Sequence, residues 1–389
     1  VIGENNASSV PGPVNRDYSR RMVYVPERQT ALYVGGSHRT RRYNDVWEYH
    51  LASNTWQQLF PTEGGNHASL KDAATSLLSK YEDNPRIEFS PKQREAIEKS
   101  AAWWQKNVVL EGGRITTRLG GPIMPSHTWD ALVYDASAGK LLWPIGASPL
   151  STSRRYAFFT GLPREQVDQH INQEYSTFWT FDPGTQQYGQ VKKAPNMPRL
   201  EGMGGSMVYL PDQQESVYYV AASNVVPHEY GMYRYNARLN SWRPLVTNGG
   251  RSLRELVKKE GAAPGPELQM AYSEKHQKLV AVRKSSTYVF DLLANSWSKV
   301  AETPLINAHG NLSNFVYDPE SDQFILAMPL KEKKLAAFSL ETGQWRELEP
   351  RGDQMPKPIY RRSLSFWHPL LKVMVLRPDQ GGAWVYKPG

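Results

Sequence analysis

The stretch MVYVPERQTALYVGG at residues 22–36, continued by VWEY at 46–49 and NTW at 54–56, decides the fold. An apolar strand ends at a tight turn, a second apolar strand follows, a third ends in an aromatic residue, and another turn leads to Trp56. The phrase recurs, in full, stretched or cut short, at 134–188, 209–242, 272–297, 317–345 and 366–386. Repeats of about 40 to 50 residues with four strands each are typical of β-propellers. The alternative, an antiparallel sandwich of short strands, does not explain so regular a recurrence.

These copies predict an all-β, six-bladed propeller formed by a single domain over residues 1–389. Aromatic residues open the outer strands, where each would cover the gap between two blades with an apolar ring: Trp56, Tyr188, Trp242, Trp297 and Trp345. The sixth copy stops after Tyr386, before any outer strand. Closing the ring would then need a strand from residues 1–14, a segment rich in Asn, Ser and Pro that is a poor strand former.

The first copy resembles the Kelch-repeat family of propellers. The resemblance rests on the pair Gly35-Gly36, on Tyr33 before it and on Trp56 further along. It covers nearly the whole chain, although only the first copy keeps the Gly-Gly pair in its usual place. A Kelch resemblance implies the fold and very little about function, because one fold carries many activities.

Composition narrows the classes of partner and chemistry. The chain has 46 Lys and Arg against 38 Asp and Glu, and its net charge of +8 favours an acidic partner. No recognition motif for nucleic acid accompanies that charge, so no nucleic-acid partner is expected. No apolar run is long enough to span a membrane, and the absence of Cys excludes disulfides and thiolate chemistry. The chain begins with Val1, for which a cleaved signal peptide is one explanation, and we expect a secreted or periplasmic monomer.

Three insertions interrupt the propeller, and all are expected to rise from one face. Loops between second and third strands open on the same side as loops between blades. The largest insertion, 62–125, joins blades 1 and 2 and contains helical patterns at 70–80 and 90–108, the second of which we expect to pack on the propeller. The other two are 147–175, inside blade 2, and 248–264, with a short helix near 253–259. Long insertions on one rim usually build a site.

Histidine and arginine side chains are expected to gather on this insertion-bearing face. His127 and His309 stand just before innermost strands, at the mouth of the central channel, while His228 and Tyr230 lie in a loop of a neighbouring blade. The candidate substrate-binding residues are Arg20, Arg39, Arg154, Arg155, Tyr360, Arg361 and Arg362. One alternative stays open, in which the groups at the channel mouth only plug it with hydrogen bonds.

A face rich in His, Tyr and Arg and poor in carboxylates suits β-elimination of a uronate-containing polysaccharide. A neutral His or a Tyr removes the proton beside the carboxylate, Arg stabilises the enediolate, and a Tyr hydroxyl protonates the leaving oxygen. His127 is the preferred base and Tyr230 the preferred acid, with His228 and His309 next. In fold and site composition the chain resembles propeller polysaccharide lyases such as the ulvan and rhamnose-glucuronate lyases. That resemblance implies a secreted lyase acting on an anionic polysaccharide.

The main alternative is a non-catalytic Kelch module that binds a glycan or a protein. No His-Glu-x-x-His motif, Gly-x-Ser-x-Gly elbow or Gly-rich phosphate loop is present, and no cofactor is expected. A Zn or Ca site assembled from His and Asp residues of different blades stays compatible with the spacing.

Overall fold

Tight hairpins with one recurring backbone geometry connect the strands. In this computed structural model the last residue of the first turn has a positive φ in every copy of the repeat: Gln29, Gly139, Gln214, Gln277, Asp322 and Lys372. The second turn ends the same way at Asn54, Gln186, Asn240, Asn295 and Gly343. A turn closed by a left-handed residue matches the right-handed twist of the two strands that it joins. The turns therefore fix the hairpin register from blade to blade.

The structure describes residues 12–13, 19, 21–35, 44–61, 88–123, 128–144, 149–198, 200, 205–220, 231–245, 253, 256, 268–283, 285–304, 314–328, 334–355, 363–378 and 383–388. Structural statements below concern these residues.

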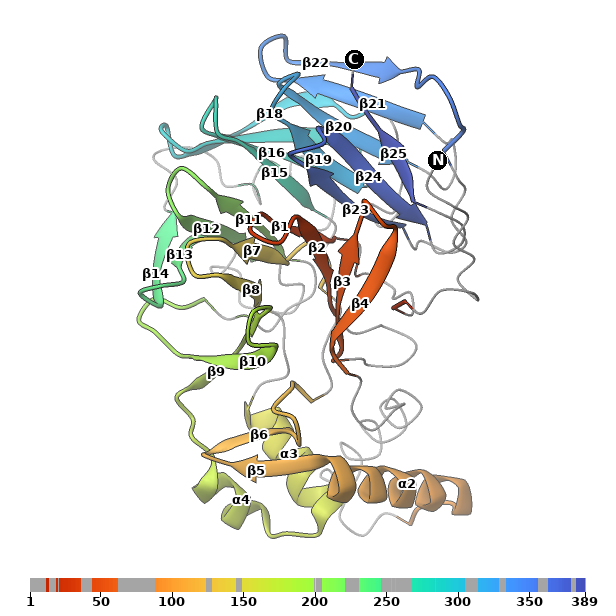
Figure 1. Cartoon of the computed structure of the whole chain (residues 1–389). Helices are drawn as coiled ribbons and strands as arrows, with labels where there is room; N and C mark the ends of the chain where they lie inside the picture. The colour runs from red at the N-terminus through yellow and green to blue at the C-terminus, as the bar shows by residue number, and fades with distance from the viewer. Residues whose placement is uncertain are drawn as a thin grey trace.

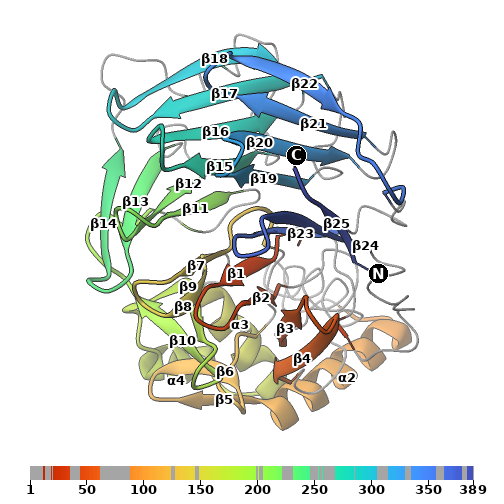
Figure 2. The same ribbon diagram turned by 45° about the horizontal axis from the view of Figure 1, so that its top comes forward.

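The protein is a six-bladed β-propeller, as predicted, with the blades following one another in chain order around an axis (Figures 1 and 2). Five blades are four-stranded antiparallel sheets. Blades 1 and 2 contain β1 (Val23–Val25), β2 (Thr30–Tyr33), β3 (Val46–His50) and β4 (Thr55–Phe60), then β7 (Val133–Asp135), β8 (Lys140–Trp143), β9 (Tyr175–Asp182) and β10 (Gln187–Lys192). Blades 3 and 4 contain β11 (Ser206–Leu210), β12 (Glu215–Tyr219), β13 (Met232–Asn236) and β14 (Ser241–Leu245), then β15 (Gln269–Ser273), β16 (Lys278–Arg283), β17 (Ser286–Asp291) and β18 (Ser296–Glu302). Blades 5 and 6 contain β19 (Asn314–Asp318), β20 (Gln323–Met328), β21 (Lys334–Ser339) and β22 (Gln344–Leu348), then β23 (Ser363–His368), β24 (Val373–Pro378) and β25 (Trp384–Tyr386).

The outer aromatic residues fill the gaps between blades, which confirms their predicted role. Tyr188 of blade 2 packs edge-on against Phe60 of blade 1, with ring centroids 4.9 Å apart. Trp242 of blade 3 lies 5.7 Å from Phe178 of blade 2. In blade 5 the outer Trp345 donates its indole N–H to Thr287 Oγ1 of blade 4 at 2.8 Å.

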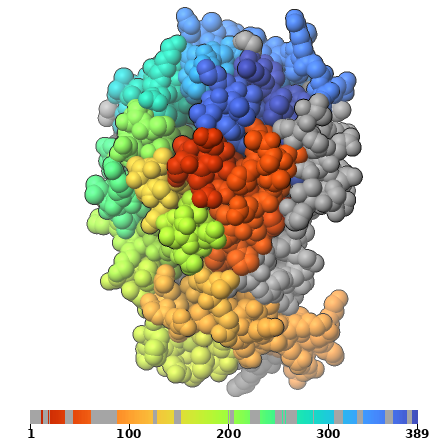
Figure 3. All heavy atoms as spheres, viewed as in Figure 1, coloured from red at the N-terminus to blue at the C-terminus, as the bar shows by residue number. Residues whose placement is uncertain are grey.

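Blade 6 has three strands in the described part of the chain. Of residues 1–14 only Gly12 and Pro13 are described, and neither belongs to a strand; Gly12 lies so close to Trp56 that a Cβ would sit 2.9 Å from the indole. The first and last blades share an apolar cluster that includes Met22, Trp56 and Phe366, and Met22 N donates to Ser365 O at 3.1 Å. Their atoms lie side by side on the surface in Figure 3, red and orange against blue.

Two of the insertions form one helical layer at one end of the molecule, beside blades 1 and 2 (Figure 1). The first contributes α2 (Pro91–Asn107) and a hairpin of β5 (Val108–Glu111) and β6 (Arg114–Thr117); the second contributes α3 (Pro149–Thr160) and α4 (Arg164–His170). The helix predicted at 90–108 is present, with its Ser90 capping box. We expected this helix to pack on the propeller; its Trp104 stacks on Phe159 of α3, with centroids 5.6 Å apart, inside an apolar cluster distinct from those of the blades.

The remaining insertion predictions are tested only in part. The pattern at 70–80 lies outside the described residues. Of the short helix expected at 253–259, Leu253 and Leu256 are described; both are helical and pack on the apolar cluster between blades 3 and 4.

Candidate functional site

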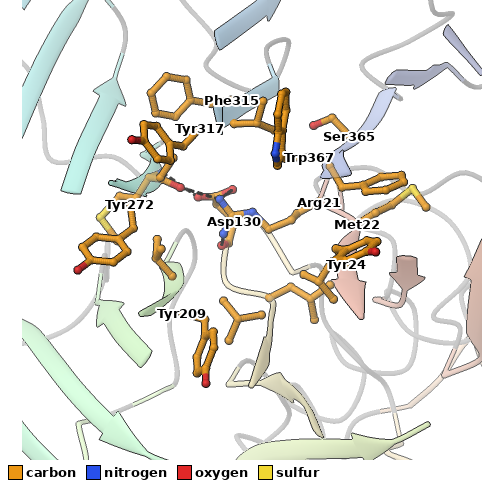
Figure 4. A pocket seen from close by; sticks show the side chains of 18 of the residues that line it. Arg21, Met22, Tyr24, Asp130, Tyr209, Tyr272, Phe315, Tyr317, Ser365 and Trp367 are labelled. Atoms are coloured by element: carbon orange, nitrogen blue, oxygen red, sulfur yellow. Dashed lines mark hydrogen bonds and ion pairs between the residues drawn. The ribbon is translucent and has the colours of Figure 1, made fainter. Parts of the chain in front are cut away.

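A pocket of about 400 Å³ occupies the propeller axis, enclosed by the innermost strands of all six blades (Figure 4). In every blade the next-to-last residue of the innermost strand lines the pocket and is aromatic: Tyr24, Tyr134, Tyr209, Tyr272, Tyr317 and Trp367. We call these residues the aromatic ring. First-turn residues such as Pro211, Glu274 and Pro369 line one end of the pocket, and Arg21 and Asp130 line the other. A pocket of this size with largely apolar walls matches the small-molecule sites of proteins.

Hydrogen bonds to the preceding blade hold the tyrosines of the aromatic ring in place. Tyr134 donates its hydroxyl to Glu27, and Tyr272 donates to Asp212 at 3.0 Å. The same link joins blades 3 and 2, where Ser137 N donates to Tyr209 Oη at 3.2 Å. Because these three phenols are anchored behind the wall, their ring edges and faces remain for the pocket.

Burial and these carboxylates also keep the phenols uncharged. Burial raises the pKa of Tyr272, and its hydrogen bond to Asp212 raises it further. Burial likewise raises the pKa of Tyr317, Tyr209 and Tyr24. A phenol with a raised pKa is a poor general base, so this part of the wall is suited to contact with a ligand rather than to removing its proton.

Asp322 ties the aromatic ring to the first turns of blades 4 and 5. Its carboxylate accepts hydrogen bonds from Tyr317 at 2.8 Å and from Lys275 at 2.7 Å, and His276 Nε2 lies 2.7 Å from it. Burial alone would raise the pKa of Asp322, but these hydrogen bonds outweigh burial and lower the pKa to about 2.

Asp322→Asn is therefore expected to lower the free energy of unfolding at neutral pH by about 1 kcal/mol, since Lys275 is mostly exposed and solvent screens its charge. A depressed carboxyl pKa stabilises the fold above the unfolded value of 3.8, and that contribution is lost as the pH falls towards about 2. Urea unfolding at several pH values should thus show the parent and variant converging across this window. A difference that persists below it would mean that Asp322 acts through something other than its charge.

The seam between blades 6 and 1 differs from the others. Within the described residues neither the Tyr24 hydroxyl nor the Trp367 indole N–H has a hydrogen-bond partner. The Tyr24 ring instead contacts the His368 imidazole, with centroids 4.9 Å apart. At this seam the aromatic ring is held by packing alone.

An ion pair between partly buried Arg21 and buried Asp130 lies at the other end of the pocket. Arg21 crosses the axis and places Nη2 3.1 Å from Asp130 Oδ1, while its guanidinium donates to Met207 O at 2.6 Å and to Met270 O at 2.7 Å. The second oxygen of Asp130 accepts hydrogen bonds from Ser206 Oγ at 2.5 Å and Met270 N at 3.0 Å. This network joins blades 1, 2, 3 and 4 across one end of the pocket.

The backbone around Asp130 is unusual. Trp129 is 5% exposed and has a φ of 54°, a left-handed conformation that is rare for a bulky residue. Beside it, Gly35 has a φ of 123° and approaches Ser19 and Thr128 so closely that a Cβ would lie 2.7 Å from Ser19 Oγ. The Gly35 of the Kelch-like pair thus makes room for the segment that positions Asp130.

Most of the sequence-predicted site residues lie outside the described part of the chain: His127, Tyr230, His228, His309, Arg20, Arg39, Tyr360, Arg361 and Arg362. Their roles stay predictions. Arg154 and Arg155 are described, are partly buried in α3 of the helical layer, and do not line the axial pocket.

Sequence reasoning missed Arg21 and the aromatic ring. The signal was present, because a Tyr or Trp precedes the residue that leads into the first turn in every copy. It was interpreted as a marker of strand ends rather than as a wall.

The described residues contain neither a metal-binding cluster nor a membrane-spanning helix. Among the described residues no three His, Asp or Glu side chains lie close enough together to hold a metal ion. None of the helices in the described ranges is long and apolar enough to cross a bilayer.

No protein-family model matches this chain, and no curated protein matches it significantly.

Proposed function

We propose that the protein is a carbohydrate-binding propeller whose axial pocket holds the end of a glycan. The observation that carries the proposal is the aromatic ring around a pocket of about 400 Å³. The C–H faces of a sugar ring are apolar and pack well against aromatic side chains. Gln269, Asn314 and Ser365 add polar residues to the same wall. The Kelch-like first copy is compatible with such a module.

The pair of Arg21 and Asp130 limits how a glycan enters. Arg21 and Asp130 lie across one end of the pocket, so we expect a glycan to enter from the end that the first turns line. A chain end or a branch fits a pocket that is entered from one end. The neutral tyrosines of the wall favour binding over proton transfer there.

One observation favours the predicted polysaccharide lyase as a second function. Trp129, with its left-handed backbone, lies two residues after the preferred base His127, and backbone strain of this kind clusters at functional sites. The chemistry would then lie beyond the Arg21 and Asp130 end of the pocket, on the side of the insertions. The net charge of +8 supports an anionic substrate for that site.

Binding is tested by titrating the protein with neutral, amine-bearing and uronate-bearing oligosaccharides in a calorimeter. Trp367→Ala removes one wall of the pocket without breaking a described hydrogen bond, and we expect it to weaken binding roughly tenfold, or about 1.4 kcal/mol. Trp384→Ala is the matched control, because Trp384 lies in the same blade, bonds to Asp353 O and does not line the pocket.

Equal affinities for the two variants would place the glycan elsewhere. The uronate-bearing samples also test the lyase, since β-elimination creates an unsaturated uronate that absorbs ultraviolet light. His127→Ala should abolish such a signal and leave Trp367-dependent binding unchanged.

A further inference from the structure

We propose that the axial pocket selects a cationic sugar, with the ammonium group of an amino sugar held against the aromatic ring near Glu274. This inference rests on the proposed glycan-binding function and adds the charge of the ligand to it. Three observations support it: the charges that line the pocket, the acceptors behind the tyrosines, and the lack of competing cations.

The charges lining the pocket leave one carboxylate unbalanced. Arg21 and Asp130 neutralise each other at one end, where the guanidinium is also bonded to backbone carbonyls. Glu274 stands at the other end, in the first turn of blade 4, and is exposed. No ion pair to Glu274 occurs among the described residues. The described lining thus carries one net negative charge.

The acceptors behind the tyrosines act in the same direction. Tyr134, Tyr272 and Tyr317 each donate the phenol hydrogen to a carboxylate, on Glu27, Asp212 and Asp322. A phenol that donates to an anion carries more electron density on its ring, and its face attracts a cation more strongly. An ammonium group near the face of a Tyr or Trp gains free energy, and gains more where water is excluded. The carboxylates that hold these tyrosines in place therefore also strengthen the attraction of the tyrosine rings for a cation.

Apart from Arg21, the described lining holds no cation that would compete with the ligand. Arg21 is the only Lys, Arg or His among the described residues that line the pocket. Elsewhere the chain is basic, with a net charge of +8, so the pocket is opposite in sign to the protein as a whole. Glu274 is exposed, so solvent screens its charge, but its Coulomb attraction still favours a positive ligand group and disfavours a uronate.

The test compares three matched sugars by titration calorimetry of the full chain, at a mildly acidic pH where amines are protonated. The probes are the trisaccharide of β-1,4-linked glucosamine, its fully N-acetylated counterpart and a trisaccharide of galacturonate. The glucosamine probe is expected to bind at least roughly fivefold more tightly than the acetylated probe, as judged by the dissociation constants. The galacturonate probe should bind most weakly of the three. Added salt should weaken binding of the glucosamine probe alone.

Glu274→Gln removes the unbalanced charge and keeps the shape of the side chain. It should weaken binding of the glucosamine probe severalfold and leave the acetylated probe unchanged. Glu320→Gln is the control, because Glu320 occupies the first turn of blade 5 but is paired with Lys372 at 2.8 Å and does not line the pocket. The affinities for the glucosamine probe and the acetylated probe should be the same in Glu320→Gln as in the parent protein.

The outcomes separate the two proposals. If the acetylated probe binds as tightly as the glucosamine probe, or if Glu274→Gln affects both equally, the pocket binds sugars without selecting a cation, and only the present inference fails. If none of the three probes binds, the glycan-binding function fails as well.

Discussion

Asp130→Ala is expected to lower the free energy of unfolding by about 3 kcal/mol, because it leaves the Arg21 guanidinium, whose side chain is only 16% exposed, without its anion. The Asp130 residue is 4% exposed, and its carboxylate also accepts the hydrogen bonds of Ser206 and Met270. The loss would thus reach blades 1 to 4 together. Unfolding in guanidinium chloride, followed by tryptophan fluorescence, measures this loss of free energy.

A double variant separates the charge from the packing. Arg21→Met with Asp130→Leu removes both charges and fills similar volumes, so it should be less destabilising than Asp130→Ala alone. An Asp130→Ala protein as stable as the parent would show that solvent or a neighbouring group neutralises Arg21.

Trp104→Ala is expected to destabilise the helical layer by about 3–5 kcal/mol, in the range for deleting a buried Trp. Trp104 is 3% exposed and stacks on Phe159 in a cluster distinct from those of the blades. The loss should therefore remain local. Hydrogen exchange is expected to accelerate in α2, α3 and α4 while the blade strands keep their protection.

The neighbouring Trp103 supplies the control. It is only partly buried, at the margin of the same cluster, so Trp103→Ala should cost markedly less. Accelerated exchange in β7 or β8 of the Trp104→Ala variant would instead make the helical layer and blade 2 one cooperative unit.

The propeller itself could be predicted because the residues that mark each repeat have roles set by local backbone geometry and packing. Each copy can be recognised locally by an aromatic residue before the first turn, a left-handed residue that ends that turn and, in the first five copies, an aromatic residue in the outer strand. Helices α3 and α4 were missed inside the insertion 147–175. The partner that stabilises α3 is Trp104 of another insertion, and such a partner is invisible in a local pattern.

The pairing of residues in the pocket could not be predicted from the sequence. Arg20 was chosen as a channel residue and lies outside the described residues, so its role stays a prediction. Its neighbour Arg21, which was not chosen, reaches Asp130 and backbone carbonyls of blades 3 and 4. Asp130 was not among the predicted site residues. Its pairing depends on how blades 1, 2 and 4 are placed in space, which no single repeat encodes.

The meeting of Met22 N with Ser365 O has a consequence for synthesis of the chain. The two residues are near opposite ends of the sequence, so the ring stays open until the ribosome has delivered β23. Until then the nascent chain exposes the apolar surfaces of blade 1 that later pack on Phe366 and Val375. Contacts between such distant residues also form slowly. We therefore expect closure of the ring by blade 6 to be a late step of folding. A chain released before that step would expose apolar surface of blade 1, which favours self-association.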